Sequence, residues 1–235
     1  MTQLTLVEAD SEMAEHRFNV TVDGELVPGL LWSPSDTQRT GPTLLLGHGR
    51  TAHKRSPHQL ALGRLMARRG WNVVSIDAPD HGERRAPDAA PIPARADPDA
   101  VIRDWRSAVD FLSNAAGIDT ERVGYWGVSM GASLGISLIA GDGRIQAAVL
   151  GLMHADWPSP PGTRIRADAA RLTCPVLFLV NWDDQRVPRL RAFELFDLIG
   201  SVDKRLHAYP GDHAELPKEA MTASVAFLAR NLEAR

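Results

Sequence analysis

Ser129 has the sequence neighbours of an activated nucleophile. It lies in the segment G-V-S-M-G (residues 127–131), between a run rich in β-forming residues (122–126) and a run typical of a helix (130–140). A side chain at either glycine would crowd the tight strand-to-helix turn that lifts a serine hydroxyl clear of a sheet. The pattern therefore predicts acyl-transfer chemistry at Ser129.

A second match to the same pattern, at residues 131–135, overlaps the first and offers Ser133 as an alternative. Ser133 is expected one turn inside the helix, whereas Ser129 stands at the junction of strand and helix. This context favours Ser129. We interpret Ser133 as a small residue that lets the helix pack closely on the sheet.

A serine hydroxyl is a poor nucleophile near neutral pH, so it needs a histidine to accept its proton and an acid to orient that histidine. His213 follows the last predicted strand, whereas its competitor His207 lies within that strand, where a histidine is more often a packed or surface residue. Asp183 and Asp184 are neighbours in a loop after a buried strand, and either one reaches an imidazole from such a loop. The chain order is therefore serine, acid, histidine, and these residues alone leave the choice of acid open.

Alternating strands and helices position these residues. The predicted strands are residues 17–22, 25–32, 43–47, 71–76, 122–126, 145–152, 176–180 and 204–209. The predicted helices are residues 57–69, 98–114, 130–140, 165–172, 188–199 and 217–232. The expected fold class is α/β, with a mostly parallel eight-stranded sheet, an antiparallel N-terminal hairpin around Asp23-Gly24, and helices on both faces. Ligands of such sheets bind at the carboxyl ends of the strands.

Length and composition indicate a single soluble globular domain over residues 1–235. The chain is 44% hydrophobic, yet it contains no apolar run near the ~20 residues that span a bilayer. The N-terminus lacks the segments of a secretory signal, so we expect a cytoplasmic protein without a membrane partner. The formal net charge is −3, and the absence of a basic stripe argues against nucleic-acid binding. The single cysteine, Cys174, excludes an internal disulfide and is predicted to be a buried thiol.

Four motifs together resemble the α/β-hydrolase superfamily, in its dienelactone hydrolase-like and prolyl oligopeptidase-like serine esterase branch. They are G-H-G-R (47–50), D-A-P-D-H-G (77–82), the Ser129 segment, and D-x-x-V-P (184–188) with G-D-H (211–213). The likeness covers nearly all of the chain and is far more specific than any single motif. It implies a catalytic triad of Ser129, Asp184 and His213.

The same resemblance implies an oxyanion hole made of the backbone amides of Arg50 and Met130, and no cofactor. It favours a serine hydrolase that cleaves carboxylic esters through an acyl-enzyme intermediate. True dienelactone hydrolases carry a cysteine at the nucleophile position, whereas this chain has Ser129. We therefore expect a general carboxylesterase rather than the dienelactone reaction.

The expected substrates are short-chain or small aromatic esters, because the chain leaves little room for a lid. Residues 85–99 and 153–164 are predicted loop excursions that rim the site, and the crossover helix predicted at residues 165–172 follows the second of them. The side chains expected to contact substrate are His53, His81, Met153, Trp157 and Trp182.

A metal site is the competing interpretation of the loops after the third and fourth strands. Six side chains there carry metal-binding groups: His48, His53, Asp77, Asp80, His81 and Glu83. Their spacing matches no known ligand pattern, so we expect no metal. Asp77 and His81 are predicted to form hydrogen bonds within the loop beside the oxyanion hole, and His48 is predicted to brace that loop.

The sequence is also compatible with functions other than ester hydrolysis. The same three residues serve acyltransferases, thioesterases and enzymes that hydrolyse carbon–carbon bonds, and fold alone does not separate these reactions. A noncatalytic ligand-binding protein is the alternative of another class, and the complete set of triad residues argues against it. The sequence is compatible with a monomer or a homodimer.

Overall fold

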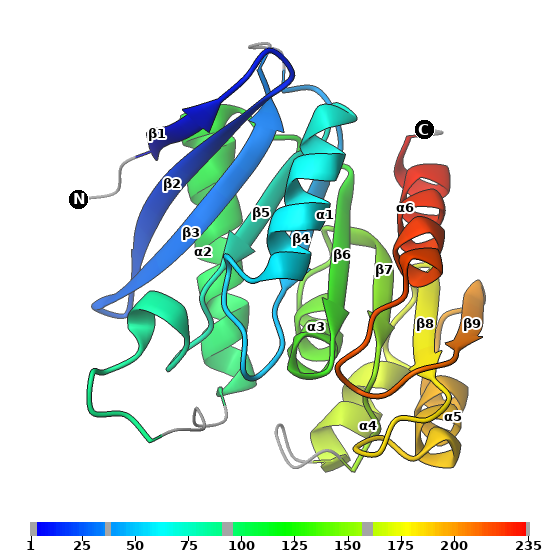
Figure 1. Ribbon diagram of the computed structural model, residues 1–235. Coiled ribbons are helices and arrows are strands. Elements are labelled where there is room, and N and C mark those ends of the chain that lie inside the picture. Colours follow the sequence, from blue (N-terminus) through cyan, green and yellow to red (C-terminus); the bar gives the residue numbers. More distant parts are fainter. Residues whose placement is uncertain (1–3, 36–38, 91–95, 157–161, 234–235) are drawn as a thin grey trace.

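A single mixed sheet crosses the molecule in the computed structural model (Figure 1), which describes residues 4–35, 39–90, 96–156 and 162–233. Within these residues the sheet has nine strands in the order β1-β2-β3-β5-β4-β6-β7-β8-β9. Their bounds are β1 Leu4–Ala9, β2 Met13–Val22, β3 Glu25–Pro34, β4 Thr43–Gly47, β5 Asn72–Ile76, β6 Val123–Val128, β7 Ile145–Gly151, β8 Val176–Asn181 and β9 Lys204–Tyr209.

The sheet is antiparallel at its N-terminal edge and parallel elsewhere. Strand β2 pairs antiparallel with β1 on one side and with β3 on the other, and β3 pairs antiparallel with β5. Strands β5, β4, β6, β7, β8 and β9 all run parallel. Strands β4, β7 and β8 are covered on both faces and are largely apolar runs, as the sequence pattern predicts.

One strand more is present than the eight predicted from the pattern. Strand β1 lies at the edge of the sheet, and five of its six residues are exposed. A strand of this kind is held by backbone pairing with one neighbour and buries little of its own surface. Hydrophobic periodicity therefore gives no signal for it.

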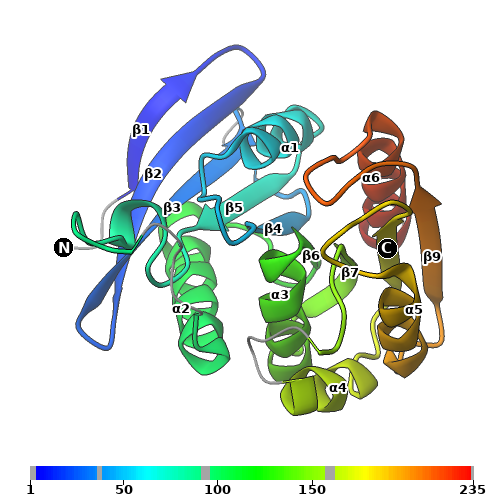
Figure 2. The same ribbon diagram turned by 60° about the horizontal axis from the view of Figure 1, so that its bottom comes forward.

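Helices cover both faces of the sheet, as Figure 2 shows. Their bounds are α1 Pro57–Arg68, α2 Pro98–Ala116, α3 Met130–Gly141, α4 Gly162–Ala170, α5 Arg189–Leu198 and α6 Lys218–Leu232. Helices α1 and α6 pack on one face, through a core that includes Met66 and Phe227. Helices α2, α3, α4 and α5 pack on the other, through a core that includes Trp105 and Leu134. None of the described helices is both long and apolar enough to cross a membrane.

Helix α2 shows how local sequence sets an element's ends. The carboxylate of Asp97 accepts hydrogen bonds from the amides of Asp99 and Ala100 at 3.2 and 3.3 Å, which caps the first turn. Gly117 ends the helix in the left-handed conformation, with φ 64°. Between these caps, Trp105 lies on the buried face. The predicted excursion at residues 85–99 therefore gives way to the helix at residue 98, and its residues 91–95 lie outside the described part.

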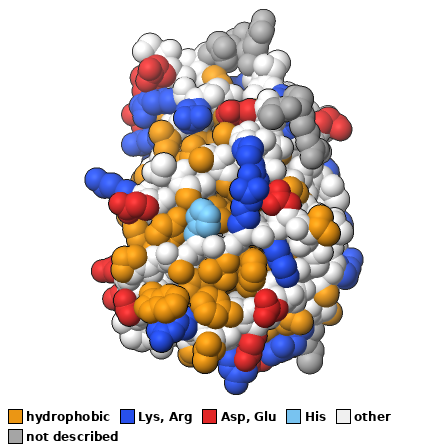
Figure 3. Space-filling view, turned by 90° about the vertical axis from the view of Figure 1, so that its right-hand side faces the viewer, with side chains coloured by type: hydrophobic (Ala, Val, Ile, Leu, Met, Phe, Trp, Pro, Cys, Tyr) orange, Lys and Arg blue, Asp and Glu red, His pale blue; other side chains and the backbone are white. Residues whose placement is uncertain are grey.

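Strand β9 leaves one edge of the sheet open. Its neighbour is β8, and its own side chains alternate between half-buried and exposed. Hydrophobic side chains gather over the lower half of this side of the molecule (Figure 3). An open edge and an apolar surface are compatible with either expected oligomeric state, so monomer or homodimer stays a prediction.

Candidate active site

Ser129 occupies a strained turn between β6 and α3. Its φ and ψ are 56° and −123°, a conformation that costs a residue with a side chain about 1–3 kcal/mol. Its amide donates to the carbonyl of Gly151 at 2.9 Å, which ties the turn to the end of β7. A Cβ at Gly131 would lie 2.5 Å from the carbonyl oxygen of Gly47, and one at Gly127 would lie 2.8 Å from the backbone of Gly131. Both glycines are therefore needed for the close approach of β4, β6 and α3.

Three side chains that are far apart in the sequence meet at the carboxyl ends of the strands. The Ser129 hydroxyl oxygen lies 3.0 Å from Nε2 of His213. Nδ1 of the same imidazole lies 2.7 Å from Oδ2 of Asp184. Both distances fall in the hydrogen-bonding range. The arrangement orients the imidazole so that its Nε2 faces the hydroxyl group.

Asp184 is held as a carboxylate. Its Oδ1 accepts hydrogen bonds from the amides of Arg186 and Val187 at 2.8 and 2.9 Å. Burial acts to raise the pKa of this carboxyl group. The hydrogen bond and charge of His213 and the two amide donors outweigh burial, so the pKa lies below its usual value. Asp184 is therefore ionised at neutral pH.

The alternative residues are placed elsewhere. Ser133 is fully buried inside α3, and Asp183 is exposed. His207 is exposed on β9, with Nδ1 3.2 Å from the hydroxyl of Tyr209. Cys174 is partly buried, which raises the pKa of its thiol to about 11. Geometry thus favours the same three residues that the family resemblance implies.

The turn after β4 brings Arg50 to the same edge of the sheet. Arg50 and Ser129 line one pocket of about 560 Å³. Met130 is the first residue of α3, and the first amides of a helix have no acceptor within the helix. His48 braces the turn, because its Nδ1 lies 2.8 Å from the carbonyl of Gly49 and its Nε2 accepts from the amide of Ala78 at 3.0 Å. Burial lowers the pKa of His48 to about 4, so the ring is neutral.

The pocket is walled by the turn after β4, the start of α1 and the loop that carries His213. Its lining includes Thr51, Ser56, His58, Gln59, Trp126, Val128, Leu152, Arg186, Ala214, Glu215 and Leu216. Arg186 was not predicted as a site residue, although its place inside the D-x-x-V-P motif is a signal for it. Most of the other lining residues come from loops that the fold brings together, which sequence patterns do not resolve.

The side chains expected to contact substrate lie elsewhere. Met153 and His81 are 0% and 1% exposed, and His53 is exposed on the turn after β4. Trp182 is 46% exposed, with the Arg189 guanidinium 4.6 Å from its ring centroid. None of these four is among the described residues that line the pocket. Trp157 lies outside the described residues, as do residues 157–161 of the predicted excursion at 153–164.

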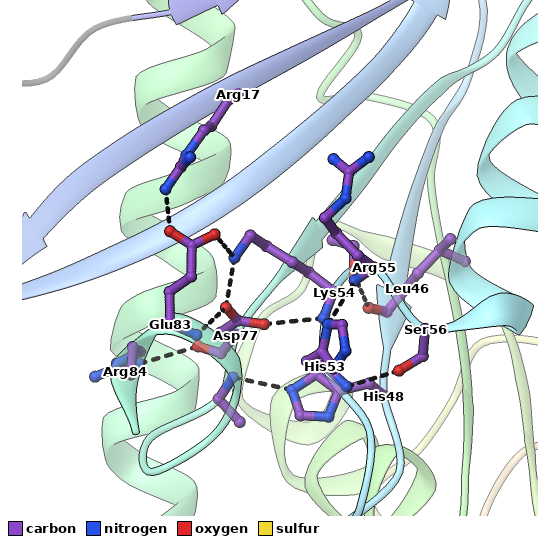
Figure 4. Close-up of polar contacts among 12 residues, drawn as sticks. Arg17, Leu46, His48, His53, Lys54, Arg55, Ser56, Asp77, Glu83 and Arg84 are labelled. Carbon is purple, nitrogen blue, oxygen red and sulfur yellow. Dashed lines mark hydrogen bonds and ion pairs between the residues drawn. The ribbon is translucent and has the colours of Figure 1, made fainter. Parts of the chain in front are cut away.

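A buried ion pair joins the two loops beside the turn (Figure 4). Lys54 is 2% exposed, and its Nζ donates to Oδ2 of Asp77 at 2.5 Å and to Oε1 of Glu83 at 2.6 Å. Asp77 also accepts from the amides of Lys54 and Glu83, each at 2.9 Å. Burial acts to raise the pKa of Asp77, but these donors outweigh it and the pKa is lowered. The predicted hydrogen bonding of Asp77 within the loop thus runs to Lys54 and Glu83, and Lys54 had no signal in the sequence.

No group of three or more His, Cys, Asp or Glu side chains in the described part of the chain has an arrangement that could hold a metal ion. Of the six side chains considered for such a site, Asp77 and Glu83 bind Lys54, and His48 and His81 contact the backbone. The absence of a metal stays a prediction.

Replacing Lys54 by methionine is expected to lower the free energy of unfolding by about 3–5 kcal/mol, because it leaves the carboxylate of Asp77 buried and unpaired. Urea unfolding measures the change. As a control, Arg103→Gln removes the exposed ion pair with Asp23, whose side chains are 50% and 67% exposed, and should change stability little. The double variant Lys54→Met/Asp77→Asn should recover part of the loss. Equal stability of Lys54→Met and wild type would contradict the buried pair.

Comparison with known proteins finds clear relatives, although no family model matches the chain. A cold-adapted esterase from an Arctic intertidal metagenomic library is 35% identical, with a TM-score of 0.84 over 96% of this chain and 97% of that one. A Klebsiella pneumoniae protein provisionally named dienelactone hydrolase has the same fold, with 16% identity and a TM-score of 0.76 over 93% of this chain and 99% of that one.

A curated relative matches part of the chain. Thiohydrolase aneE of Aspergillus aculeatus is 30% identical over 130 residues, which are 55% of this chain and 38% of that protein. The chain spans less than half the length of the curated relatives that it matches.

Proposed function

The chain belongs to the α/β-hydrolase superfamily, among its dienelactone hydrolase-like serine esterases, and we propose that it hydrolyses carboxylic esters at Ser129. The contact of the Ser129 hydroxyl with His213, which is itself oriented by Asp184, carries this proposal. The residues occur in the chain order that the superfamily uses, and each follows the carboxyl end of a parallel strand.

In the first half of the reaction, His213 Nε2 accepts the proton of the Ser129 hydroxyl while Oγ attacks the ester carbonyl carbon. The carbonyl oxygen becomes an oxyanion. When the tetrahedral intermediate collapses, the bond to the alcohol oxygen breaks and His213 returns its proton to the leaving alcohol. The acyl group is then bonded to Ser129. Asp184 keeps the Nδ1 proton of His213 in place and stabilises the imidazolium that forms in between.

Water completes the cycle at the same residues. His213 accepts a proton from the water, whose oxygen attacks the acyl carbon, and Ser129 leaves with that proton when the second intermediate collapses. Both intermediates carry an oxyanion, for which the amides of Arg50 and Met130 are the proposed donors. The amide of Met130 lies at the N-terminus of α3, where the helix dipole also favours negative charge.

We propose short-chain or small aromatic esters as substrates. The pocket beside Ser129, about 560 Å³, is bounded by the apolar side chains of Val128, Leu152 and Leu216. A pocket of this size also accommodates larger ligands, so the preference for small acyl groups rests on the little sequence that is available for a lid over a long acyl chain. Thioester hydrolysis is the second candidate, because part of the chain is similar to a protein named thiohydrolase. The same acyl-enzyme would form, with a thiol as the leaving group.

A fluorophosphonate trap tests the proposal together with p-nitrophenyl esters of increasing chain length. Intact-mass measurement should show one phosphonyl group per folded protein, because an activated serine attacks such reagents. Turnover should be highest with acetyl to butyryl esters and fall for longer chains. Matched thioesters, followed by thiol release, separate the two candidate reactions. Folded protein that neither labels nor turns over would reject the triad and favour a noncatalytic binding protein.

A further inference from the structure

The amide of Arg50 is presented by a β-turn. The amide of Ala52 donates to the carbonyl of Gly49 at 3.1 Å, which places Arg50 and Thr51 at the two central positions. The peptide between these two residues is the one that turns over when a β-turn changes between types I and II. A fixed direction for the Arg50 amide therefore requires both peptide groups that flank this residue to be held.

His48 holds the first of these peptide groups. Its Nε2 accepts from the amide of Ala78 at 3.0 Å, so the neutral ring carries its proton on Nδ1. Nδ1 then donates to the carbonyl of Gly49, 2.8 Å away. Because a trans peptide is planar, the Arg50 N–H points opposite to that carbonyl. The Arg50 N–H therefore points away from the His48 ring.

His81 is placed to hold the second peptide group. Its Nε2 lies 2.8 Å from the carbonyl oxygen of Arg50, and its Nδ1 lies 2.7 Å from that of Pro79. Carbonyl oxygens accept hydrogen bonds, so each nitrogen contributes as a donor when it carries a proton. The side chain is 1% exposed, so water is poorly placed to replace a lost contact.

The loop that carries His81 is itself fixed. Asp77, four residues earlier, is held by Lys54, which belongs to the loop that contains the turn (Figure 4). Gly82 has φ 52°, and a Cβ there would lie 2.3 Å from the Asp77 carboxyl group. The two loops are thus joined by an ion pair on one side and by His81 on the other. The distance from His81 to Arg50 is set by both.

We propose that His81 is a positioning residue of the oxyanion hole: by donating from Nε2 to the Arg50 carbonyl, it fixes the central peptide of the 49–52 turn and hence the direction of the Arg50 amide. The inference rests on the proposed function, since it requires that amide to receive the oxyanion. In this role His81 acts through the Arg50 peptide and does not contact the substrate. Its effect should therefore appear in kcat rather than in KM.

Two amide substitutions separate the two hydrogen bonds of His81. The side-chain nitrogen of glutamine reaches about the position of Nε2, whereas that of asparagine reaches about the position of Nδ1. His81→Gln should keep the donor to Arg50 and hold kcat within about 3-fold of wild type. His81→Asn and His81→Phe should lower kcat about 10- to 100-fold with little change in KM, which is the effect of a displacement of about 1 Å at a reacting group.

The controls separate positioning from folding and from the proposed function. His207→Gln alters an exposed histidine on β9 and should leave kcat unchanged, and urea unfolding checks that every variant is folded. Equal kcat values for His81→Gln and His81→Asn, whether high or low, would overturn the positioning role. An inactive wild type would instead reject the proposed esterase function.

A measurement on the wild type covers the case in which the variants fail to fold. Nitrogen-15 NMR of the histidine rings should show a protonated Nε2 for His81 and a protonated Nδ1 for His48. An unprotonated Nε2 on His81 in active enzyme would overturn the inference, because that nitrogen could not donate to the Arg50 carbonyl.

Discussion

Ser129→Ala is expected to lower kcat for ester hydrolysis by about 10⁴- to 10⁶-fold, the loss found when a serine nucleophile is removed from a triad. The hydroxyl oxygen, 3.0 Å from His213, is the atom that the substitution deletes. Alanine retains a Cβ at the strained φ of 56°, so the fold should persist. Steady-state rates with a short p-nitrophenyl ester, and loss of fluorophosphonate labelling, measure the effect.

Ser133→Ala is the matched control, because Ser133 stands in the overlapping G-x-S-x-G pattern but is fully buried in α3. This variant should keep wild-type labelling and turnover. Retained labelling of Ser129→Ala, or an equal loss in Ser133→Ala, would show that the nucleophile has been assigned wrongly.

Asp184→Asn is expected to lower kcat about 10⁴-fold while leaving the substrate affinity largely unchanged. The carboxylate accepts a hydrogen bond from Nδ1 of His213, which lies 2.7 Å from Oδ2. An amide nitrogen in that place would donate instead and favour the imidazole tautomer with its proton on Nε2. In that tautomer Nε2 no longer accepts the serine proton.

Asp183→Asn is the control for this second prediction, since the neighbouring side chain is exposed and has the same chemistry. Its kcat should stay within a few-fold of the wild-type value. A larger loss for Asp183→Asn than for Asp184→Asn, measured on folded proteins, would transfer the role of the acid to Asp183.

The sequence patterns located the parallel strands well and missed the antiparallel edge strand β1. Among the buried strands, β4 has the predicted bounds, Thr43–Gly47, and β8, Val176–Asn181, extends one residue beyond its predicted range. Buried strands are apolar and are bounded by turn residues, so their signal is local. Strand β1 is held by backbone hydrogen bonds to β2. Such pairing depends on the folded structure and leaves no hydrophobic periodicity in the sequence of β1.

The same distinction applies to the site. Ser129, Asp184 and His213 lie in short motifs whose spacing is fixed by a turn, and the structure brings them into contact. The pocket wall combines residues from α1, from the end of β6 and from several loops, and most of these residue types have no special chemistry. Lys54 and Asp77 are 23 positions apart and meet through the pairing of β4 with β5. Such contacts follow from packing, so residue type alone does not single them out.

The burial of Lys54 restricts where amine-directed reagents attach to this protein. The sequence contains three lysines, Lys54, Lys204 and Lys218. Lys54 is enclosed in its ion pairs, and the ammonium of Lys204 donates to three carbonyls at the end of α5. Lys218 is exposed at the start of α6, two residues after Leu216 of the pocket wall. Apart from the amino terminus, Lys218 is therefore the amine that an amine-reactive dye should label. A fluorophore at Lys218 would lie near the pocket, where its emission would report ligand binding and release.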